Sequence, residues 1–349
     1  MYCVFLQNKT KFLTRGKIVI AYKIYKCNIY EYLSYIKINF LINIITMKKK
    51  AFSLIELSVV VVIIALIIAA ITQSSRLVSQ MRLTNARKLT NNSAIPALNN
   101  IIAWYDATSI EAFDVSKTNH TDKINKWVDS EVRVHDRIVL EQTNTSNQPI
   151  YQTNSINGLP AIYFDGNDYL EGNEKLIEGI LSYYSGSFFM VFETDDITTK
   201  QTIFSQNNQA TADGVDIGID FATNGDYGIC SSETNCASGA STTRSANAIV
   251  LPKKKSVLTI IINNTNTVNI YQDSNLINAS SGYNPTGNNV GLSKVIMGAK
   301  RDDSNNLSSY FKGKIAEIII FNRSLPGEDR REIERYLGKK WNIKIINID

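Results

Sequence analysis

Apolar residues are concentrated in one run that follows a short basic segment. Lysines occupy positions 48–50, and all but one of the residues from Leu57 to Ile71 are apolar. Counted from Phe52 the stretch is 20 residues long, and a helix of this length crosses a hydrocarbon layer of about 30 Å. Basic residues stay on the cytoplasmic side of such a helix. The pattern therefore predicts a transmembrane helix over residues 52–74, with the following chain outside the cytoplasm.

A helical pattern continues beyond the apolar run. No Gly or Pro occurs between Ile71 and Pro96, and apolar residues such as Met81 and Leu89 recur at near-helical spacing. We expect one continuous helix from about residue 53 to 90, roughly 55 Å long at 1.5 Å per residue. Residues 75–100 would then form a helical stalk and linker. A short flexible linker behind the membrane helix is the alternative.

From residue 101 onward the chain consists of short β-rich runs separated by Asn, Gly, Asp and Ser. This spacing favours an antiparallel β-sandwich of the jelly-roll type. The pattern predicts a hairpin turn at residues 263–266. A closing helix is expected from Gly327 to Trp341, acidic at its start and basic at its end, with residues 343–349 as a tail. The expected strands are 161–164, 187–193, 201–205, 215–221, 256–262, 267–272, 294–299 and 313–321.

The charge of the chain is unevenly distributed. Residues 1–46 contribute +6 and the lysines at 48–50 contribute +3 to a total of +5, so the remainder from Ala51 onward carries −4. The part expected to fold is thus mildly acidic, and the composition gives no support for nucleic-acid binding. Only two histidines, His120 and His135, are present, which argues against chemistry built on several imidazoles.

The segment from residue 48 to 57 reads Lys-Lys-Lys-Ala-Phe-Ser-Leu-Ile-Glu-Leu. It resembles the N-terminus of type IV prepilins and of type II secretion pseudopilins. The resemblance implies a leader at 47–51, cleavage by a prepilin peptidase between Ala51 and Phe52, and methylation of the new Phe52 amine. It also implies that Glu56 pairs with the N-terminal amine of a neighbouring pilin or pseudopilin subunit during assembly. Ala51 departs from the Gly usual at that position, so slower cleavage is expected.

Glu56 is unusual on physical grounds as well. A carboxylate within an apolar span costs about 2–3 kcal/mol on insertion scales, and a buried charge is tolerated when it is paired. One alternative is a carboxylate that lies at the membrane interface, where the cost is small. Another is a plain signal peptide, which would need a small-residue cleavage site after the apolar region; Ala69 and Ala70 are the residues available there.

Several segments of the β-rich region share the pattern of one superfamily. They are 102–107 (Ile-Ala-Trp-Tyr-Asp-Ala), 127–129 (Trp-Val-Asp), 157–166 (Asn-Gly-Leu-Pro-Ala-Ile-Tyr-Phe-Asp-Gly), 186–192 (Gly-Ser-Phe-Phe-Met-Val-Phe) and 311–325 (Phe-Lys-Gly-Lys-Ile-Ala-Glu-Ile-Ile-Ile-Phe-Asn-Arg-Ser-Leu). Together they resemble the concanavalin A-like lectin/glucanase superfamily, in its laminin G-like branch, over residues 101–342. Members bind glycans or proteins, hydrolyse polysaccharides or provide bulk, so fold does not fix function.

Candidate chemistry in this region is sparse. The glucanase branch carries a Glu-x-Asp-x-x-Glu strand whose alternate carboxylates face one cleft. That pattern is missing from this sequence. We therefore expect no enzymatic activity and no required cofactor. Asp213, Asp216 and Asp220 are calcium candidates, because hard cations take several oxygen ligands; exposed strand carboxylates are the alternative. Trp104 and Trp127 could stack on a sugar, or they pack in the core.

Two of the cysteines flank a short polar loop. Cys230 and Cys236 are separated by Ser-Ser-Glu-Thr-Asn, and in an exported domain such a pair reads as a small disulfide. Two free buried thiols are the alternative.

These patterns lead to one functional hypothesis and two rivals. We expect a single-pass inner-membrane protein with a periplasmic or extracellular head. After assembly it would be a minor or tip subunit of a surface filament, and its head would bind a glycan or a surface protein. The first rival is an uncut, membrane-anchored lectin or adhesin that does not polymerise. The second is a secreted glycoside hydrolase.

The mature N-terminus provides the first test. Residues 1–46 have no capping or turn pattern, and Met47 begins a short basic leader by itself. We therefore expect that translation starts at Met47 and that residues 1–46 are not part of the protein. Mass spectrometry of the native protein should find methylated Phe52 at the N-terminus. A peptide from residues 1–46 would contradict the assigned start, and a retained 48–51 segment would contradict the processing.

Overall fold

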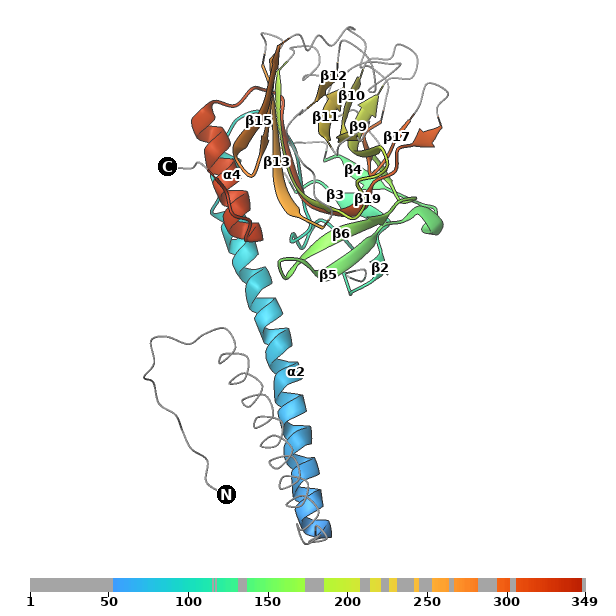
Figure 1. Cartoon of the computed structure of the whole chain (residues 1–349), viewed down its shortest axis with the longest axis vertical. Coiled ribbons are helices and arrows are strands. Elements are labelled where there is room, and N and C mark those ends of the chain that lie inside the picture. The colour runs from blue at the N-terminus through green and yellow to red at the C-terminus, as the bar shows by residue number, and fades with distance from the viewer. Residues whose placement is uncertain are drawn as a thin grey trace, which may run out of the picture. The chain divides into compact units, whose positions relative to one another are not determined.

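The structure is a computed structural model, and two compact units divide the chain, residues 1–72 and 73–349 (Figure 1). It describes residues 53–114, 116, 118–130, 137–172, 185–207, 214–220, 226–230, 242–244, 253–263, 267–281, 294–301 and 306–346.

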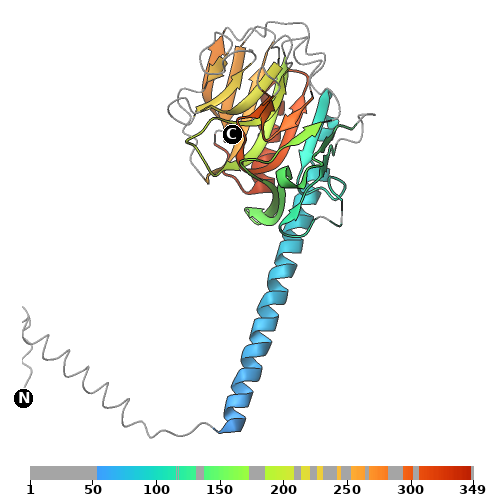
Figure 2. The ribbon, with the colours of Figure 1, turned by 90° about the vertical axis from the view of Figure 1, so that its right-hand side faces the viewer.

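The first described element is the helix α2, Leu54–Asn91, which is 38 residues long. It is drawn as one unbroken ribbon in Figure 2, as expected for a sequence without Gly or Pro over this length. The continuous helix is confirmed and the flexible linker is excluded. A short 3₁₀ helix, Ile95–Ala97, follows with a proline in its first turn, and this places Ile101 at the start of the first strand.

The region after residue 100 contains a larger and a smaller antiparallel sheet. The larger sheet has the order β15 (Asn275–Ser281), β14 (Thr267–Gln272), β13 (Lys255–Ile262), β8 (Gly186–Thr194), β19 (Lys312–Phe321), β6 (Leu159–Asp165), β5 (Ile150–Ile156) and β2 (Asp122–Lys123), and β1 (Ile101–Asp106) also pairs with β19. The smaller sheet has the order β12 (Thr242–Arg244), β11 (Asp226–Cys230), β10 (Gly214–Asp220), β9 (Gln201–Asn207), β16 (Ile296–Met297), β7 (Leu170–Gly172), β4 (Val139–Glu141) and β3 (Lys126–Val128). The strands β17 (Lys300–Arg301) and β18 (Leu307–Ser308) form a separate pair. The expected antiparallel β-sandwich is confirmed.

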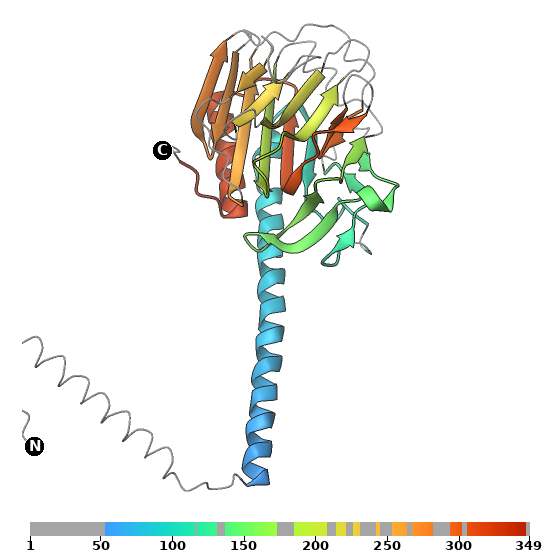
Figure 3. The same cartoon turned by 45° about the vertical axis from the view of Figure 1, so that its right-hand side comes forward.

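The larger sheet is buried on both faces. One face packs on the smaller sheet, and the other is covered by α4, Gly327–Trp341, and by the end of α2 (Figures 1 and 3). All nine residues of β8 are consequently buried. Phe188 and Phe192 belong to the core between the sheets, whereas Phe189 and Val191 face the second core under α4. A strand covered on both sides has no polar face, which explains the apolar run from Phe188 to Phe192 within β8.

Most expected elements are confirmed, with two instructive exceptions. The closing helix has the expected bounds, and β13 and β14 pair as the expected hairpin. The expected strand over 294–299 is wrong, because only Ile296 and Met297 form a strand. Gly298 has φ +88° and donates its N–H to the carbonyl of Ile203, so the chain turns away there. The pattern also missed β1, although Ile101–Asp106 pairs with β19 in the larger sheet.

A tight turn brings the β5–β6 hairpin to the helices. Asn157 and Gly158 both have positive φ, 51° and 86°, as a two-residue type I′ turn requires. The Asn157 side-chain amide donates to the carbonyl of Trp341 at 2.6 Å. The positive φ of Gly158 is the reason that glycine is favoured where the turn approaches Arg82 of α2.

Candidate functional site

Two parts of the chain carry functional residues, and the first is the start of α2. The apolar residues there are exposed, from 46% at Val60 to 84% at Leu54. The helix is long and apolar enough to cross a membrane. A surface of this size has no stable place in water, so it needs a lipid or protein environment. Ala51 and Phe52 lie outside the described residues.

Glu56 has a local role at the helix start. Its Oε2 accepts the backbone N–H of Ser53 at 2.9 Å, and the Ser53 hydroxyl accepts the N–H of Ile55 at 3.3 Å. This reciprocal arrangement is a capping box, which satisfies backbone donors that the first helical turn leaves open. The Ser-x-x-Glu spacing was readable from the sequence as a cap. Glutamine at position 56 could make the same contact, so capping alone does not require a charge.

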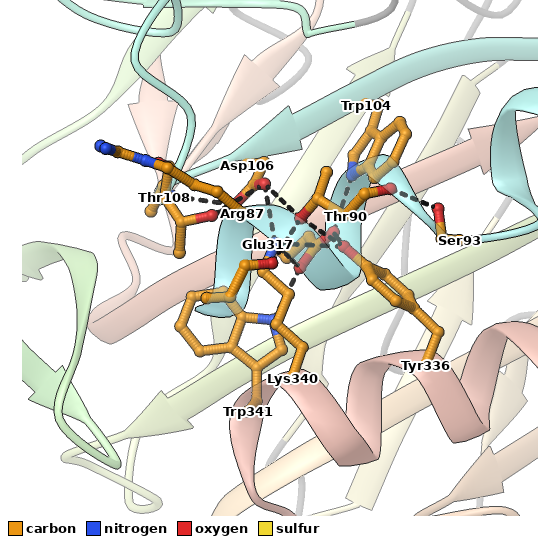
Figure 4. Close-up of polar contacts among 12 residues, drawn as sticks. Arg87, Thr90, Ser93, Trp104, Asp106, Thr108, Glu317, Tyr336, Lys340 and Trp341 are labelled. Atoms are coloured by element: carbon orange, nitrogen blue, oxygen red, sulfur yellow. Dashed lines mark hydrogen bonds and ion pairs between the residues drawn. The ribbon is translucent and has the colours of Figure 1, made fainter. Parts of the chain in front are cut away.

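The second part is a buried polar cluster where the end of α2 meets the head, and we call it the stalk joint. It consists of Thr90 of α2, Trp104 and Asp106 of β1, Glu317 of β19, and Tyr336, Lys340 and Trp341 of α4 (Figure 4). Within the joint, Asp106 and Glu317 are direct partners across β1 and β19. A bulge between Ile315 and Glu317 interrupts the register of β19 with β8 at this point. Two like charges placed opposite each other destabilise a sheet unless a cation lies between them.

Lys340 supplies that cation. Its Nζ lies 2.7 Å from Asp106 Oδ2 and 2.8 Å from Glu317 Oε2. The side chains of Lys340 and Glu317 are fully buried, and that of Asp106 is 1% exposed. Two carboxylates and one ammonium group are therefore held together without water. An arrangement of this kind is stable only when hydrogen bonds satisfy the remaining lone pairs.

Aromatic donors complete the shell of Glu317. The indole N–H of Trp104 donates to Oε1 at 2.7 Å, and the indole N–H of Trp341 donates to Oε2 at 2.6 Å. The Tyr336 hydroxyl donates to Oε1 at 2.8 Å. With Lys340, Glu317 thus accepts four hydrogen bonds from charged or polar groups of two elements, β1 and α4. The carboxylate fixes α4 against β1 and β19.

Asp106 is held in the same way, and its contacts reach the stalk. The backbone N–H and the hydroxyl of Thr108 both donate to Asp106 Oδ1 at 2.8 Å. The hydroxyl of Thr90 lies 3.3 Å from Oδ2 and 3.0 Å from the Tyr336 hydroxyl. One turn earlier, Arg87 donates from Nε to the carbonyl of Thr108 at 2.7 Å. The last turns of α2 are thereby tied to both the first strand and the last helix of the head.

Burial governs the protonation of this cluster. Burial raises the pKa of Glu317, the attraction of Lys340 opposes that rise, and the charge of Asp106 adds to it. Burial also raises the pKa of Tyr336 well above its usual value, with a further contribution from Glu317. Tyr336 therefore stays a hydrogen-bond donor at neutral pH.

The sequence pattern did not indicate the joint, although Trp104, Asp106 and Glu317 lie in the segments that resemble the lectin superfamily. Glu317 stands alone in the apolar run Ile-Ala-Glu-Ile-Ile-Ile, and an isolated charge in a strand without a polar face was the available signal. Nothing local indicated that Asp106 and Lys340, far apart in sequence, would lie beside it.

The remaining candidates from the sequence are the two tryptophans, the calcium aspartates and the cysteine pair. Trp127 is fully buried and Trp104 is 4% exposed, so both rings pack in the interior and neither presents a face for a sugar. Asp213 and Cys236 lie outside the described residues, as do the side chains of Asp216, Asp220 and Cys230. Among the described residues, no group of three His, Cys, Asp or Glu is placed to hold a metal ion. The calcium site and the disulfide stay predictions.

Comparison with known proteins identifies the start of the chain. Residues 46–72 match the family model of the prokaryotic N-terminal methylation motif. The N-terminal segment is type IV pilin-like. Cleavage by a prepilin peptidase and assembly with other pilin subunits are the general properties that this motif implies. No curated protein matches the chain.

Similar solved structures are distant β-sandwich domains. Domain 4 of AbnA, a GH43 extracellular arabinanase from Geobacillus stearothermophilus, is 14% identical, covers 66% of this chain and 96% of its own, and has a TM-score of 0.43. The CBM40 of Ruminococcus gnavus IT-sialidase is 13% identical over 48% of this chain and 92% of its own, with a TM-score of 0.38. The K499G mutant of NanB sialidase from Streptococcus pneumoniae is 15% identical over 49% of this chain and 26% of its own, with a TM-score of 0.39. These likenesses are too distant to transfer a ligand or an activity.

The structure predicts that replacing the buried Lys340 lowers the free energy of unfolding more than replacing the exposed Lys126. Lys340→Met leaves two buried carboxylates without their cation, and we expect a loss of about 3–5 kcal/mol in the free energy of unfolding. Lys126→Met removes a pair with Glu141 that is 2.9 Å long but about half exposed, so it should cost less than about 1 kcal/mol. Urea unfolding of the detergent-solubilised chain, followed by fluorescence of the buried tryptophans, measures both. Equal small losses would show that the joint does not depend on its charge balance.

Proposed function

We propose that the chain is a non-enzymatic type IV pilin-like subunit that is processed before Phe52 and assembled into a surface filament. The observation that carries this proposal is the combination of the methylation motif with an apolar helix whose side chains have no partner within the described chain. Before assembly the helix would be held in the inner membrane, with the head periplasmic. In the filament, neighbouring helices would cover the same apolar surface.

The stalk joint supports this role mechanically. A subunit that is held by its N-terminal helix carries load from α2 into the head, and the contacts of Thr90 and Arg87 lie on that path. A flexible linker would leave the head free to swing, whereas α2 continues without interruption to the joint. The uncut membrane-anchored adhesin needs no such rigid coupling.

A minor or tip position suits the size of the head. The head spans residues 101–342 as a sandwich of two large sheets with a covering helix, and a domain of this bulk is difficult to repeat at every position of a helical lattice. If purified filaments consist mainly of this chain, the tip position is wrong.

Charge at position 56 distinguishes the filament subunit from the uncut anchor. In the filament, Glu56 would pair with the N-terminal amine of a neighbour, and a buried charge without that partner would be costly. Glu56→Gln keeps an acceptor for the N–H of Ser53 and removes the charge. We therefore expect both Glu56→Gln and Glu56→Ala to abolish incorporation into sheared filaments at unchanged membrane levels.

The two variants separate capping from pairing. If Glu56→Gln assembles like the wild type and Glu56→Ala does not, the residue acts only as a helix cap. Normal assembly of both would favour the uncut anchor.

We further propose that the head binds a ligand, with surface glycans as the first candidates. The support is the resemblance of residues 101–342 to a lectin-containing superfamily together with the confirmed sandwich. A glycan array probed with the detergent-solubilised chain should show binding to at least one glycan class, and hydrolysis products should be absent. A silent array would remove the lectin role, and released sugar would favour the hydrolase.

A further inference from the structure

The stalk joint also has the composition and geometry of a reaction site. Lys340 Nζ lies 2.7 Å from Asp106 Oδ2, and Glu317 Oε2 lies 2.8 Å from the same nitrogen. An amine, a carboxyl group and a second carboxylate are thus in contact, and all three side chains are at most 1% exposed. We propose that Lys340 and Asp106 condense into an intramolecular isopeptide bond, with Glu317 as the proton relay.

Proximity and burial both favour the condensation. Two groups held in contact react with effective molarities of about 10⁵–10⁸ M when their orientation is productive. In water the ionised pair is favoured over the amide, because both ions are hydrated. Inside the joint that hydration is absent, and an ion pair without water is costly to maintain. Conversion of the pair to a neutral amide and a released water removes two buried charges.

The carboxyl group of Asp106 has donors at both oxygens, because the Thr108 hydroxyl also lies 2.9 Å from Oδ2, but only Oδ1 binds a backbone N–H. Its Oδ1 accepts the backbone N–H and the hydroxyl of Thr108, both at 2.8 Å. When the amine adds to Cγ, negative charge develops on one oxygen, and donors fixed at that oxygen stabilise it. Lys340 approaches from the side of Oδ2, so the two oxygens have separate roles. Oδ1 is retained in the amide and Oδ2 departs.

Glu317 is placed to move the protons. The ammonium group of Lys340 gives one proton to Glu317, and the neutral amine forms a bond from Nζ to Cγ of Asp106. A second proton then leaves the nitrogen as the bond from Cγ to Oδ2 breaks, and Oδ2 departs as water with the two protons that came from Nζ. No electron is transferred, and Glu317 ends as a carboxylate. Burial raises the pKa of Glu317, which assists its transient protonation.

The surrounding aromatic side chains hold the Glu317 carboxylate in position both before and after the condensation. Trp104 and Trp341 donate to different oxygens of Glu317, so its position does not depend on Lys340 alone. After condensation these two indoles and the Tyr336 hydroxyl would still hold the remaining carboxylate. The same rings exclude the water that hydrolysis of the amide would need.

The bond would change how the head carries load. Asp106 ends the first strand after the stalk, and Lys340 lies in the last helix. An amide between them closes most of the head into one covalent loop. Tension that enters through α2 could then not separate β1 from α4 without breaking a covalent bond. This goes beyond the proposed filament role, since it concerns the maturation of the head itself.

Mass spectrometry of the wild-type full chain in detergent tests the bond directly. The denatured, intact protein should be lighter by one water molecule than the mass calculated for the processed chain that begins at methylated Phe52. Trypsin should not cut after a linked Lys340, so digestion should yield residues 89–117 joined to residues 340–344. The joined peptide locates the loss of water and distinguishes it from dehydration elsewhere. A chain without the loss of water that gives residues 89–117 and 341–344 as free peptides overturns the proposal.

Two variants examine the chemistry. Lys340→Arg keeps a cation in the joint but should leave the chain at full mass, without the joined peptide. Glu317→Gln keeps the shape of the relay and removes its basicity, and the linked fraction should fall at least tenfold at equal times after synthesis. A fully linked Glu317→Gln chain would overturn the role of Glu317 as the relay.

Discussion

The organisation of this protein depends on a cluster of ionised side chains that is buried in the head. Lys340 lies between Asp106 and Glu317, two carboxylates that strand pairing places opposite each other. Removal of Lys340 would leave two buried carboxylates without their cation. The cost of that imbalance forces β1, β19 and α4 into one arrangement. Since Thr90 contacts the same cluster, the end of the stalk is included in it.

The other constraint is the apolar start of α2. Its side chains are exposed along the whole span. Near the end of the same helix, Ala86 is 2% exposed in the core under α4, and Leu83, Arg87, Leu89 and Thr90 are half-buried. One helix therefore has two different surroundings. The first part needs a membrane or neighbouring helices, and the last part is a structural element of the sandwich.

Several features of the fold followed from local pattern. The helix, the strands 187–193, 256–262 and 313–321, and the closing helix were readable because apolar periodicity, length and end signals agreed. The strand expected at 294–299 failed because the pattern does not show that Gly298 adopts a positive φ. Trp104 and Trp127 were ambiguous as ligand or core residues until their burial was known, since an indole serves in either place.

The sequence by itself determined the anchor, the methylation motif and the sandwich class, because each of these is written in contiguous residues. Only the tertiary structure decided the stalk joint. Asp106, Glu317 and Lys340 belong to a first strand, a last strand and a last helix, and their meeting depends on sheet order and on the register of β1 with β19. Local sequence specifies periodicity and turns, whereas the proximity of distant charges is a property of the packed fold.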